Sequence, residues 1–329
     1  MRYRDVRSGT GDPNVYDFSA ADGSPIYIDR TKGREAIFIL NDADEVVEVG
    51  SRDFWLEHAL EVIESTYGDT VSIQDKDKDL LKFGRSEQVD NTSGGTTIMT
   101  LPSGVRHELD LYANDIDKVT SSSSSDASKV LSVEGHTYSA GALTFVVQDV
   151  TLDASPDTTA ATLSTPLRNV TRAYLKNSGT AGSPQSDLVG NIYFYDDNGG
   201  TITISSGVPS DTTYIHMMIR AGENQTEKAS TAISNSDYWI VTGAYCDMLS
   251  KASAAIAEVD VEIRDVENGG AWRKLFDMPC SADGGGTFRS GYPYIIIPKN
   301  HDIRMVGLGD SATDRIVSGG IFGALAVVV

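Results

Sequence analysis

Short runs of alternating apolar and polar residues, separated by Gly, Asn, Asp, Ser and Pro, fill most of the chain. This period-two pattern predicts β-strands. We therefore expect a mainly β fold of antiparallel β-sandwich or jelly-roll domains. The expected strands are residues 25–29, 36–40, 106–112, 129–134, 143–152, 170–175, 191–195, 201–204, 214–220, 238–245, 258–264, 294–297, 303–308 and 320–329.

One window has the period of an amphipathic helix instead. It follows Ser51, which suits an N-cap, and places one apolar stripe opposite three glutamates; the stripe consists of Trp55, Leu56, Ala59, Leu60 and Ile63. The sequence predicts one short helix over residues 51–66 that closes near Gly68. A second, alanine-rich window at 248–259 leads into an alternating stretch, and its first half is compatible with helix, strand or loop.

The segment at 196–200 has the composition of a tight turn. It reads Asp-Asp-Asn-Gly-Gly and lies between the alternating segments 193–195 and 201–204. Asn-Gly supplies the positive φ angles that a type I′ turn needs, so a β-hairpin is expected here.

Stretches of small residues at 92–96 and 121–125, and a change of composition near 221–225, suggest domain boundaries. We expect an N-terminal arm over 1–96 with short strands and the helix, a middle β-sandwich domain over 97–220, and a jelly-roll-like C-terminal domain over 221–329. Residues 321–329 are all apolar or small, so they should be buried in a sheet or a subunit interface.

The charge balance limits the classes of partner. The 329 residues include 27 Lys and Arg against 47 Asp and Glu, which gives a net charge of -20. Such an acidic surface repels phosphate backbones, so direct binding to nucleic acid is not expected. The chain start does not resemble a signal peptide and no run of about 18 apolar residues occurs, so neither export nor a membrane location is expected.

Catalytic motifs are missing from the sequence. It contains no phosphate-binding P-loop, no G-x-S-x-G and no H-E-x-x-H, and its five histidines lack the spacing of a metal site. We therefore assign no catalytic, cofactor or metal residue and expect no enzyme activity. Cys246 and Cys280 are too few for a disulfide framework, although one bridge between them remains open.

Three acidic segments have some features of calcium sites. Residues 75–79 begin like an EF-hand loop, but Leu80 and Ser86 stand where that loop needs Gly and Glu. Residues 41–45 and 196–198 offer carboxylate oxygens, which are equally typical of turns in an acidic protein. Four aromatic residues suit either a sugar-binding face or a strand core, with the core favoured: Trp239, Trp272, Tyr292 and Tyr294.

A set of short motifs follows the predicted helix in a fixed order. Residues 81–90 contain Lys82-Phe83-Gly84, residues 150–153 read Val-Thr-Leu-Asp, residues 168–173 read Arg-Asn-Val-Thr-Arg-Ala, and residues 222–226 read Gly-Glu-Asn-Gln-Thr. Over residues 50–329 this order resembles a family of tailed-bacteriophage virion structural proteins. Members of that family carry a Lys-Phe-Gly segment after an early helix, a Val-Thr-Leu-Asn-Gly strand end, an Arg-Val-x-Arg-Ala strand and a Gly-x-Asn-Gln-Thr turn.

The chain departs from that pattern in three places. Asp153-Ala154 stands where the family tends to have Asn-Gly, Asn169 and Thr171 flank the valine of the arginine strand, and the first 50 residues match nothing in the pattern. The resemblance implies an assembly protein that acts in the virion, is made in the cytoplasm of the bacterial host and has no catalytic or cofactor residues to carry over.

Two virion roles remain open at this point. The first is a capsid decoration or cement protein, an auxiliary head protein that bridges major capsid subunits, in which Phe54, Trp55 and Phe83 serve as interface anchors or pack in the core. The second is a tail, baseplate or receptor-binding adaptor. Both imply neighbouring virion proteins as partners and a homo-oligomer, with a trimer expected. A carbohydrate-active enzyme, which requires two converging carboxylates, is the third and least favoured hypothesis.

Overall fold

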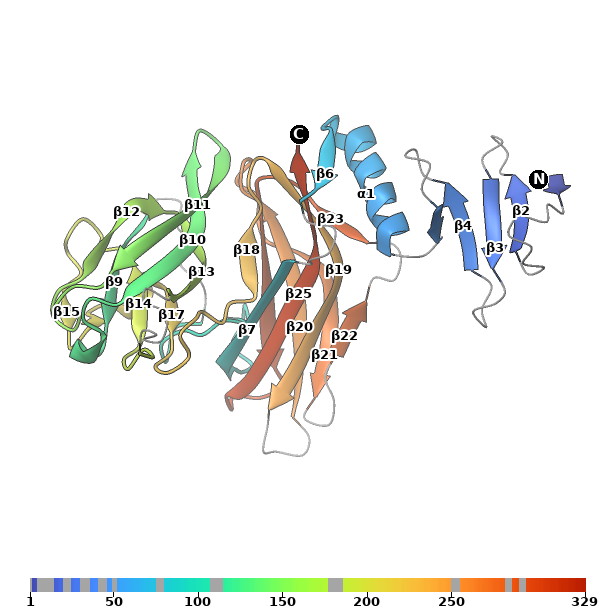
Figure 1. The fold of residues 1–329 in the computed structure, drawn as a ribbon. Coiled ribbons are helices and arrows are strands. Elements are labelled where there is room, and N and C mark those ends of the chain that lie inside the picture. Colours follow the sequence, from blue (N-terminus) through green and yellow to red (C-terminus); the bar gives the residue numbers. More distant parts are fainter. Residues whose placement is uncertain are drawn as a thin grey trace.

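The computed structural model describes side chains at residues 55–74, 80–106, 115–176, 186–248, 255–281, 286 and 294–329. It describes the backbone alone at 2–4, 15–19, 25–29, 36–40, 46–48, 52–54, 249 and 287–289. Within these residues the fold is mainly β, with antiparallel sheets and one α-helix, as the sequence predicts (Figure 1). The acidic segments 41–45 and 75–79 lie outside the described residues.

The first five strands form one antiparallel sheet in chain order. They are β1 (Arg2–Arg4), β2 (Val15–Ser19), β3 (Pro25–Asp29), β4 (Ala36–Leu40) and β5 (Val46–Glu48). The ranges of β3 and β4 are those expected from the alternating pattern. This sheet is a meander, in which each strand pairs with its neighbours in the sequence.

A β-sandwich, here called the middle body, occupies residues 116–219. One sheet has the order β11-β10-β13 and the other β12-β9-β14-β17. The strands are β9 (Ile116–Ser121), β10 (Val130–Ser139), β11 (Ala142–Thr151), β12 (Ala161–Leu167), β13 (Asn169–Leu175), β14 (Ile192–Tyr195) and β17 (Ile215–Ile219). The fully buried side chains of Leu131, Leu167, Ile192 and Phe194 fill the space between the sheets. Short 3-10 helices are η1 (Ser124–Asp126) and η2 (Thr212–Tyr214).

The hairpin expected around Asn198-Gly199 is wrong. Strand β14 pairs with β9 on one side and β17 on the other, so no edge of β14 is left for residues 201–204. Asn198, Gly199 and Gly200 all have positive φ, and the carbonyl of Asp197 accepts hydrogen bonds from the N–H groups of residues 200, 201 and 202. These hydrogen bonds close the turn around the Asp197 carbonyl, and residues 201–204 do not pair with β14.

A two-residue hairpin does occur a few residues later. Strands β15 (Ile204–Ser205) and β16 (Val208–Pro209) pair across Ser206 and Gly207, whose φ angles are 48° and 74°. This is the positive-φ geometry that the sequence suggested for Asn198 and Gly199. The hairpin covers an outer apolar cluster on β14 and β17.

The second sandwich, here called the C-terminal body, has two facing sheets. The first runs β22-β19-β25-β6, with β23 also on β19 and β7 also on β25; the second runs β18-β24-β20-β21, with β8 also on β24. The strands are β6 (Val71–Ile73), β7 (Leu80–Val89), β8 (Thr96–Thr97), β18 (Ser230–Ala232), β19 (Asp237–Leu249), β20 (Ile256–Asp265), β21 (Arg273–Ser281), β22 (Gly286–Arg289), β23 (Ile295–Ile297), β24 (His301–Gly309) and β25 (Arg315–Val328).

Strand β25 holds the C-terminal body together. It pairs with β19 on one side and with β6 and β7 on the other. Alternate side chains of β19 point to opposite faces, so Trp239 and Val241 enter the sandwich core while Tyr238 and Ile240 face outward. The predicted burial of the apolar C-terminal segment in a sheet is confirmed for Ile321, Ala324 and Ala326, whereas Val329 lies beyond the strand and is 85% exposed.

Helix α1 (Arg52–Tyr67) covers the outer face of the β19–β25 sheet. Leu56, Ala59 and Ile63 are buried against Tyr238 and Ala324, and the helix ends before Gly68, which has a φ of 73°. The predicted helix is confirmed. Its apolar stripe packs inside the chain, so the helix belongs to the C-terminal body and not to a separate arm over residues 1–96.

The middle body is inserted between β8 and β18 of the C-terminal body. Both strands pair with the same β24, and the connecting segments pair with each other: the N–H of Ala229 donates to the carbonyl of Ile98 and that of Thr100 to the carbonyl of Glu227, both at 2.9 Å. The two connections thus form an antiparallel ribbon. The expected division at residues 97 and 221 is close to the ends of this insertion, but α1, β6, β7 and β8 join the C-terminal body.

The region around 248–259 is strand on both sides of residues 250–254, which lie outside the described residues.

Cys246 on β19 and Cys280 on β21 are buried, free thiols on facing sheets of the C-terminal body. Their mutual hydrogen bond and burial raise the pKa of the Cys280 thiol. The same contact lowers the pKa of the Cys246 thiol, and both cysteines are buried parts of the core.

We predict that Gly84→Ala destabilises the protein by about 3 kcal/mol. A Cβ at Gly84 would lie 2.1 Å from the carbonyl oxygen of Ile98 and 2.4 Å from the nitrogen of Ala229, where the connecting ribbon crosses β7. Gly104→Ala is the control, because its Cβ meets nothing within 4 Å and only its φ of +84° opposes the change, at roughly 1–2 kcal/mol. Urea unfolding of both variants would contradict this account if Gly104→Ala were the more damaging.

Candidate functional site

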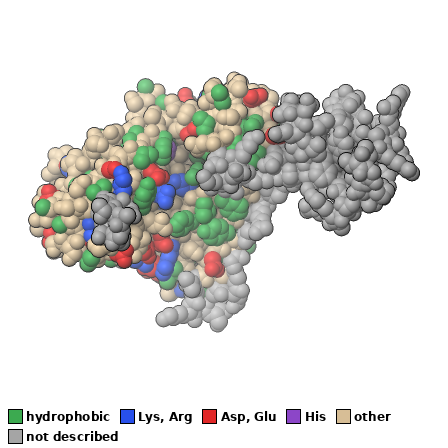
Figure 2. All heavy atoms as spheres, viewed as in Figure 1, with side chains coloured by type: hydrophobic (Ala, Val, Ile, Leu, Met, Phe, Trp, Pro, Cys, Tyr) green, Lys and Arg blue, Asp and Glu red, His purple; other side chains and the backbone are tan. Residues whose placement is uncertain are grey.

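Two adjoining cavities lie between the middle body and the C-terminal body. Their volumes are about 220 and 210 Å³, and both are lined by Leu80, Lys82, Glu134 and Thr171. We call them together the interbody cleft. Figure 2 shows basic and acidic side chains gathered near the middle of the molecule on the face drawn. Three of the motifs singled out in the sequence contribute to the lining, through Lys82-Phe83, Arg172 and Gln225-Thr226.

Lys82 comes from β7 and reaches the cleft from the C-terminal body. Burial lowers the pKa of its ammonium group to about 8, and the positive charges of Arg172 and Lys228 act in the same direction, against the carboxylate of Glu134. Among the described residues, no hydrogen-bond acceptor or carboxylate oxygen pairs with the Lys82 ammonium. Within the described part of the chain, the side chain therefore presents a positive charge without a carboxylate in direct contact.

Strands β10 and β13 of the middle body place the charged side chains of Glu134 and Arg172 in the cleft. Arg172 lies 3.6 Å from the carboxylate of Glu134, and its guanidinium stacks 4.7 Å from the ring centroid of Tyr174. The buried Lys228, on the connection back to the C-terminal body, donates to the carbonyl of Val170 at 2.7 Å. Three cations and one carboxylate thus line the same cavity.

His136 lines the second cavity in its neutral form. Burial lowers its pKa to about 4, and its Nδ1 lies 3.2 Å from the side-chain oxygen of Asn169. At neutral pH it adds a hydrogen-bonding ring to the cleft and no charge. Over both cavities, three cations (Lys82, Arg172 and Lys228) line the cleft with two carboxylates (Glu134 and Asp237), so the cleft is net positive in a chain whose total charge is -20.

A buried ion network ties the two bodies together beside the cleft. Arg168 of the middle body donates to both carboxylate oxygens of Asp302 on β24, at 3.1 and 2.8 Å, and Arg264 on β20 donates to the same carboxylate at 2.8 Å. All three side chains are less than a tenth exposed. Two-point binding of a carboxylate by arginine fixes orientation as well as distance.

The network continues along the second sheet. The guanidinium groups of Arg264 and Arg304 lie 4.5 and 4.0 Å from the ring centroid of Trp272, and Arg304 pairs with Glu262 at 2.9 Å. Trp272 therefore holds two arginines by cation–π contact. Trp272 was expected either in a strand core or on a sugar-binding face. It is instead partly buried in contact with two guanidinium groups.

Further contacts between the bodies surround the network. The side-chain oxygen of Asn300 accepts from the N–H of Leu143 at 3.0 Å, and the N–H of Asn235 donates to the carbonyl of Leu143 at 2.8 Å. Leu143 itself is fully buried against Ala232 and Val266 of the C-terminal body. A tip of the β10–β11 hairpin is thus embedded in the other body.

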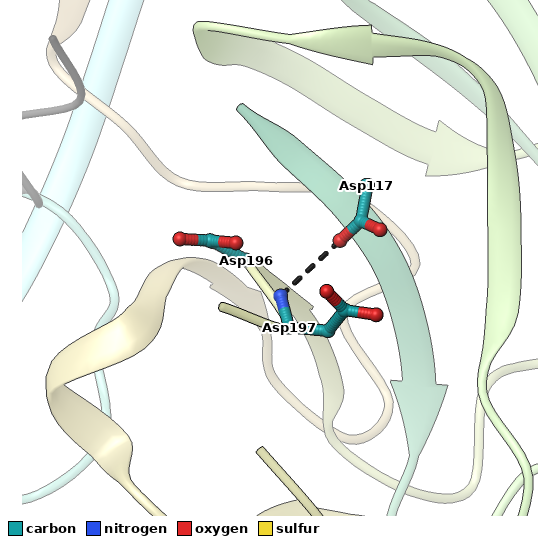
Figure 3. A group of neighbouring side chains, drawn as sticks. All are labelled: Asp117, Asp196 and Asp197. Carbon is teal, nitrogen blue, oxygen red and sulfur yellow. Dashed lines mark hydrogen bonds between the residues drawn. The ribbon is translucent and has the colours of Figure 1, made fainter. Parts of the chain in front are cut away.

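The acidic turn at 196–198 forms a cluster with Asp117, shown in Figure 3. Ligand oxygens of Asp117, Asp196 and Asp197 lie within 4.8 Å of one another, and Asp117 accepts a hydrogen bond from the N–H of Asp197 at 3.2 Å. Lys118 lies 3.1 Å from Asp117 and 3.3 Å from Asp197. This lysine already supplies positive charge to the cluster, which favours a structural turn over the calcium site considered from the sequence.

The three residues expected as interface anchors occupy different positions. The side chain of Phe54 lies outside the described residues. Trp55 is partly buried on α1, with its ring centroid 6.3 Å from that of His58, and Phe83 is partly buried in the interbody cleft. The structure does not bring Trp55 and Phe83 to one site. Of the other aromatics considered, Trp239 is a core residue, Tyr294 packs beside α1, and Tyr292 is not described.

Sequence reasoning did not identify Lys82, Arg168 or Asp302 as functional side chains. The signal available for the first two was their place in the Lys-Phe-Gly and Arg-x-Val-x-Arg motifs, which assigned no role to either. Asp302 follows no pattern that separates it from the other acidic residues of the chain. Among the described residues, no helix is both long and apolar enough to cross a membrane.

Comparison with known proteins adds little to this geometry. No family model and no curated protein matches the chain. A structure of infectious bursal disease virus, Gt strain, is similar at 10% identity over 79% of this chain and 73% of that chain, with a TM-score of 0.19. A structure of T=1 particles derived from infectious bursal virus is similar at 10% identity over 78% and 77%, with a TM-score of 0.18. TM-scores this low do not establish a common fold.

We predict that Asp302→Leu costs about 3–5 kcal/mol of unfolding free energy, because it leaves two buried arginines without their carboxylate. The matched control is Glu258→Gln, which breaks an exposed pair with Lys274 and should cost less than about 1 kcal/mol. Urea unfolding followed by tryptophan fluorescence compares them. Equal costs would show that the network does not stabilise the junction.

We predict that Lys82→Met increases stability at pH 7, by an amount on the order of 1 kcal/mol. The folded pKa of Lys82, about 8, lies below its ordinary value of 10.5. The unfolded chain therefore binds more protons between these values, and wild-type stability from this group rises with pH across that window. The advantage of the variant should shrink between pH 7 and pH 10 in urea titrations. A constant difference would mean that Lys82 is not desolvated.

Proposed function

We propose that this chain is a non-enzymatic structural protein of a tailed-phage virion, most specifically a decoration or cement protein that bridges major capsid subunits. The observation that carries the proposal is the tie between the two β-bodies. A buried, two-point ion network and an antiparallel connecting ribbon fix the bodies relative to each other. A protein that must hold two neighbours at a set spacing needs such a fixed pair of bodies.

The motifs behind the family resemblance support this proposal. Gly84 of the Lys-Phe-Gly segment gives the ribbon room to cross β7, and Arg168 of the arginine strand makes the ion network. Asn224 of the Gly-x-Asn-Gln-Thr turn has a φ of 55° and accepts from the N–H of Leu188 at 2.9 Å. These motif residues build the architecture of the two bodies and their junction, as expected of an assembly protein.

Strand β11 offers a surface for a neighbouring subunit. It is an edge strand of its sheet, and Phe145 and Val147 on it are 47% and 58% exposed. Exposed apolar side chains on an open strand edge favour contact with another protein. The acidic net charge suits a surface that faces away from packaged DNA. We propose neighbouring capsid subunits as partners and a trimer as the assembly unit.

The interbody cleft favours a second candidate function. A decoration protein needs surface area but no ligand cavity, whereas a tail, baseplate or receptor-binding adaptor uses one. The two candidates differ in abundance, because a cement protein is present near the copy number of the capsid protein and an adaptor in a few to a few dozen copies.

Quantitative gel densitometry of purified virions should give near-stoichiometric abundance, and shells stripped of the protein should burst at a lower temperature. Adding back the wild-type protein should restore the bursting temperature, and Val147→Asp on the β11 edge should fail to do so. Val189→Asp is the matched control, because Val189 is 57% exposed in the same body but does not belong to β11. A low copy number with co-purification on detached tails would overturn the cement role.

A further inference from the structure

We propose that the interbody cleft is a binding site for an oxyanion, a carboxylate or phosphate group of a small polar molecule, with Lys82 as its principal contact. This inference does not depend on the virion role. It rests on three features of the described residues: the cavity, the arrangement of cations around it, and the hydrogen-bonding groups on its walls.

The charge balance of the larger cavity points to an anion. Lys82, Arg172 and Lys228 line one cavity of about 220 Å³ with Glu134 as the one carboxylate among its described lining residues. Glu134 is engaged with Arg172 at 3.6 Å. Because the chain has 20 more acidic than basic side chains, this local excess of positive charge is the reverse of its overall balance. An anion in the cavity would offset the desolvated ammonium of Lys82.

The cations reach the cavity from separate elements. Lys82 extends from β7 of the C-terminal body, Arg172 from β13 of the middle body, and Lys228 from the connection that leads into β18. Lys228 and Arg172 are held in place by contacts with the Val170 carbonyl, Glu134 and Tyr174. The site is therefore positioned by the fold before any ligand enters, which reduces the entropy lost on binding.

The walls add groups that suit the rest of a polar ligand. The hydroxyl of Thr226 accepts from the N–H of Ala173 at 3.1 Å, which leaves its own hydrogen able to point to a ligand. Gln225 adds an amide, and Phe83 and Leu80 add apolar surface. The neighbouring cavity of about 210 Å³ continues past His136 and Phe145. Inorganic phosphate fits these groups, and so does an acidic monosaccharide, whose ring would lie against the apolar walls.

Binding should depend on pH through Lys82. The described charged or titratable groups that line the cleft with Lys82 are Glu134 and His136 on β10, Arg172 on β13, Lys228 before β18 and Asp237 on β19. His136 is neutral above pH 5, since its pKa is about 4. The pKa of Lys82 is about 8, so the cation that holds the anion is lost as the pH rises through this value.

Isothermal titration of the full chain tests the site with two anions, inorganic phosphate and glucuronate, and with glucose as the uncharged counterpart of glucuronate. We expect at least one anion to bind with a dissociation constant of millimolar or lower, and glucose to bind at least tenfold more weakly than glucuronate. Tighter binding of glucuronate than of phosphate would identify an acidic sugar as the ligand class, and the opposite order a phosphate group. Glucuronate keeps its charge between pH 7 and 9.5, so any weakening across that range reports on the protein.

Lys82→Met should weaken anion binding at least tenfold at pH 7. The variant is expected to be more stable than the wild type, so a loss of binding would not come from unfolding. Lys274→Met is the matched control, because it removes one positive charge from an exposed strand residue that does not line the cleft and should leave binding unchanged. Absence of saturable binding of both anions, or equal binding by Lys82→Met and wild type, would overturn the proposal.

The oxyanion site and the virion role can fail separately. The titrations use purified recombinant protein and report on the cleft alone, whereas copy number and shell strength report on the particle alone. An anion that binds a protein of low copy number would retain the oxyanion site and reject the cement role.

Discussion

The carboxylate of Asp302 is the point on which the arrangement of the two bodies depends. It receives hydrogen bonds from Arg168 of one body and Arg264 of the other, in a region from which water is largely excluded. Two buried guanidinium groups cannot lie so close together without an anion between them. Together with the connecting ribbon and the buried Leu143, this carboxylate therefore holds the middle body beside the cleft that Lys82 and Arg172 line.

Local structure could be predicted from the sequence wherever a segment has one apolar face and one polar face. The stripe Leu56–Ala59–Ile63 specified a helix, and the alternation along β3, β4 and β11 specified strands close to their observed limits. The turn at Asn198-Gly199 was misjudged because its residues specify positive φ but not the partner of the preceding strand. That partner, β17, lies about twenty residues further along the chain, and pairing over such distances is decided by the packing of whole sheets.

The candidate site was not predictable for a related reason. Lys82, Arg172 and Lys228 are far apart in the sequence, and each alone is an unremarkable lysine or arginine of an acidic chain. What makes them a site is the insertion of one sandwich into another, which brings β7 and β13 to opposite sides of one cavity. The predicted aromatic anchor Phe83 lines this cavity, but its neighbour Lys82 is the side chain whose pKa is shifted.

The insertion has a consequence for how such a chain can change over evolutionary time. Both ends of the middle body leave from one edge of β24, next to each other and paired as a ribbon. A recombination event that replaced the whole insert would leave every strand of the host sandwich in register, provided that the incoming module carried an arginine able to reach Asp302. The C-terminal body would then be the constant host, and the contacts at Asp302 and around Leu143 would select the modules that it accepts.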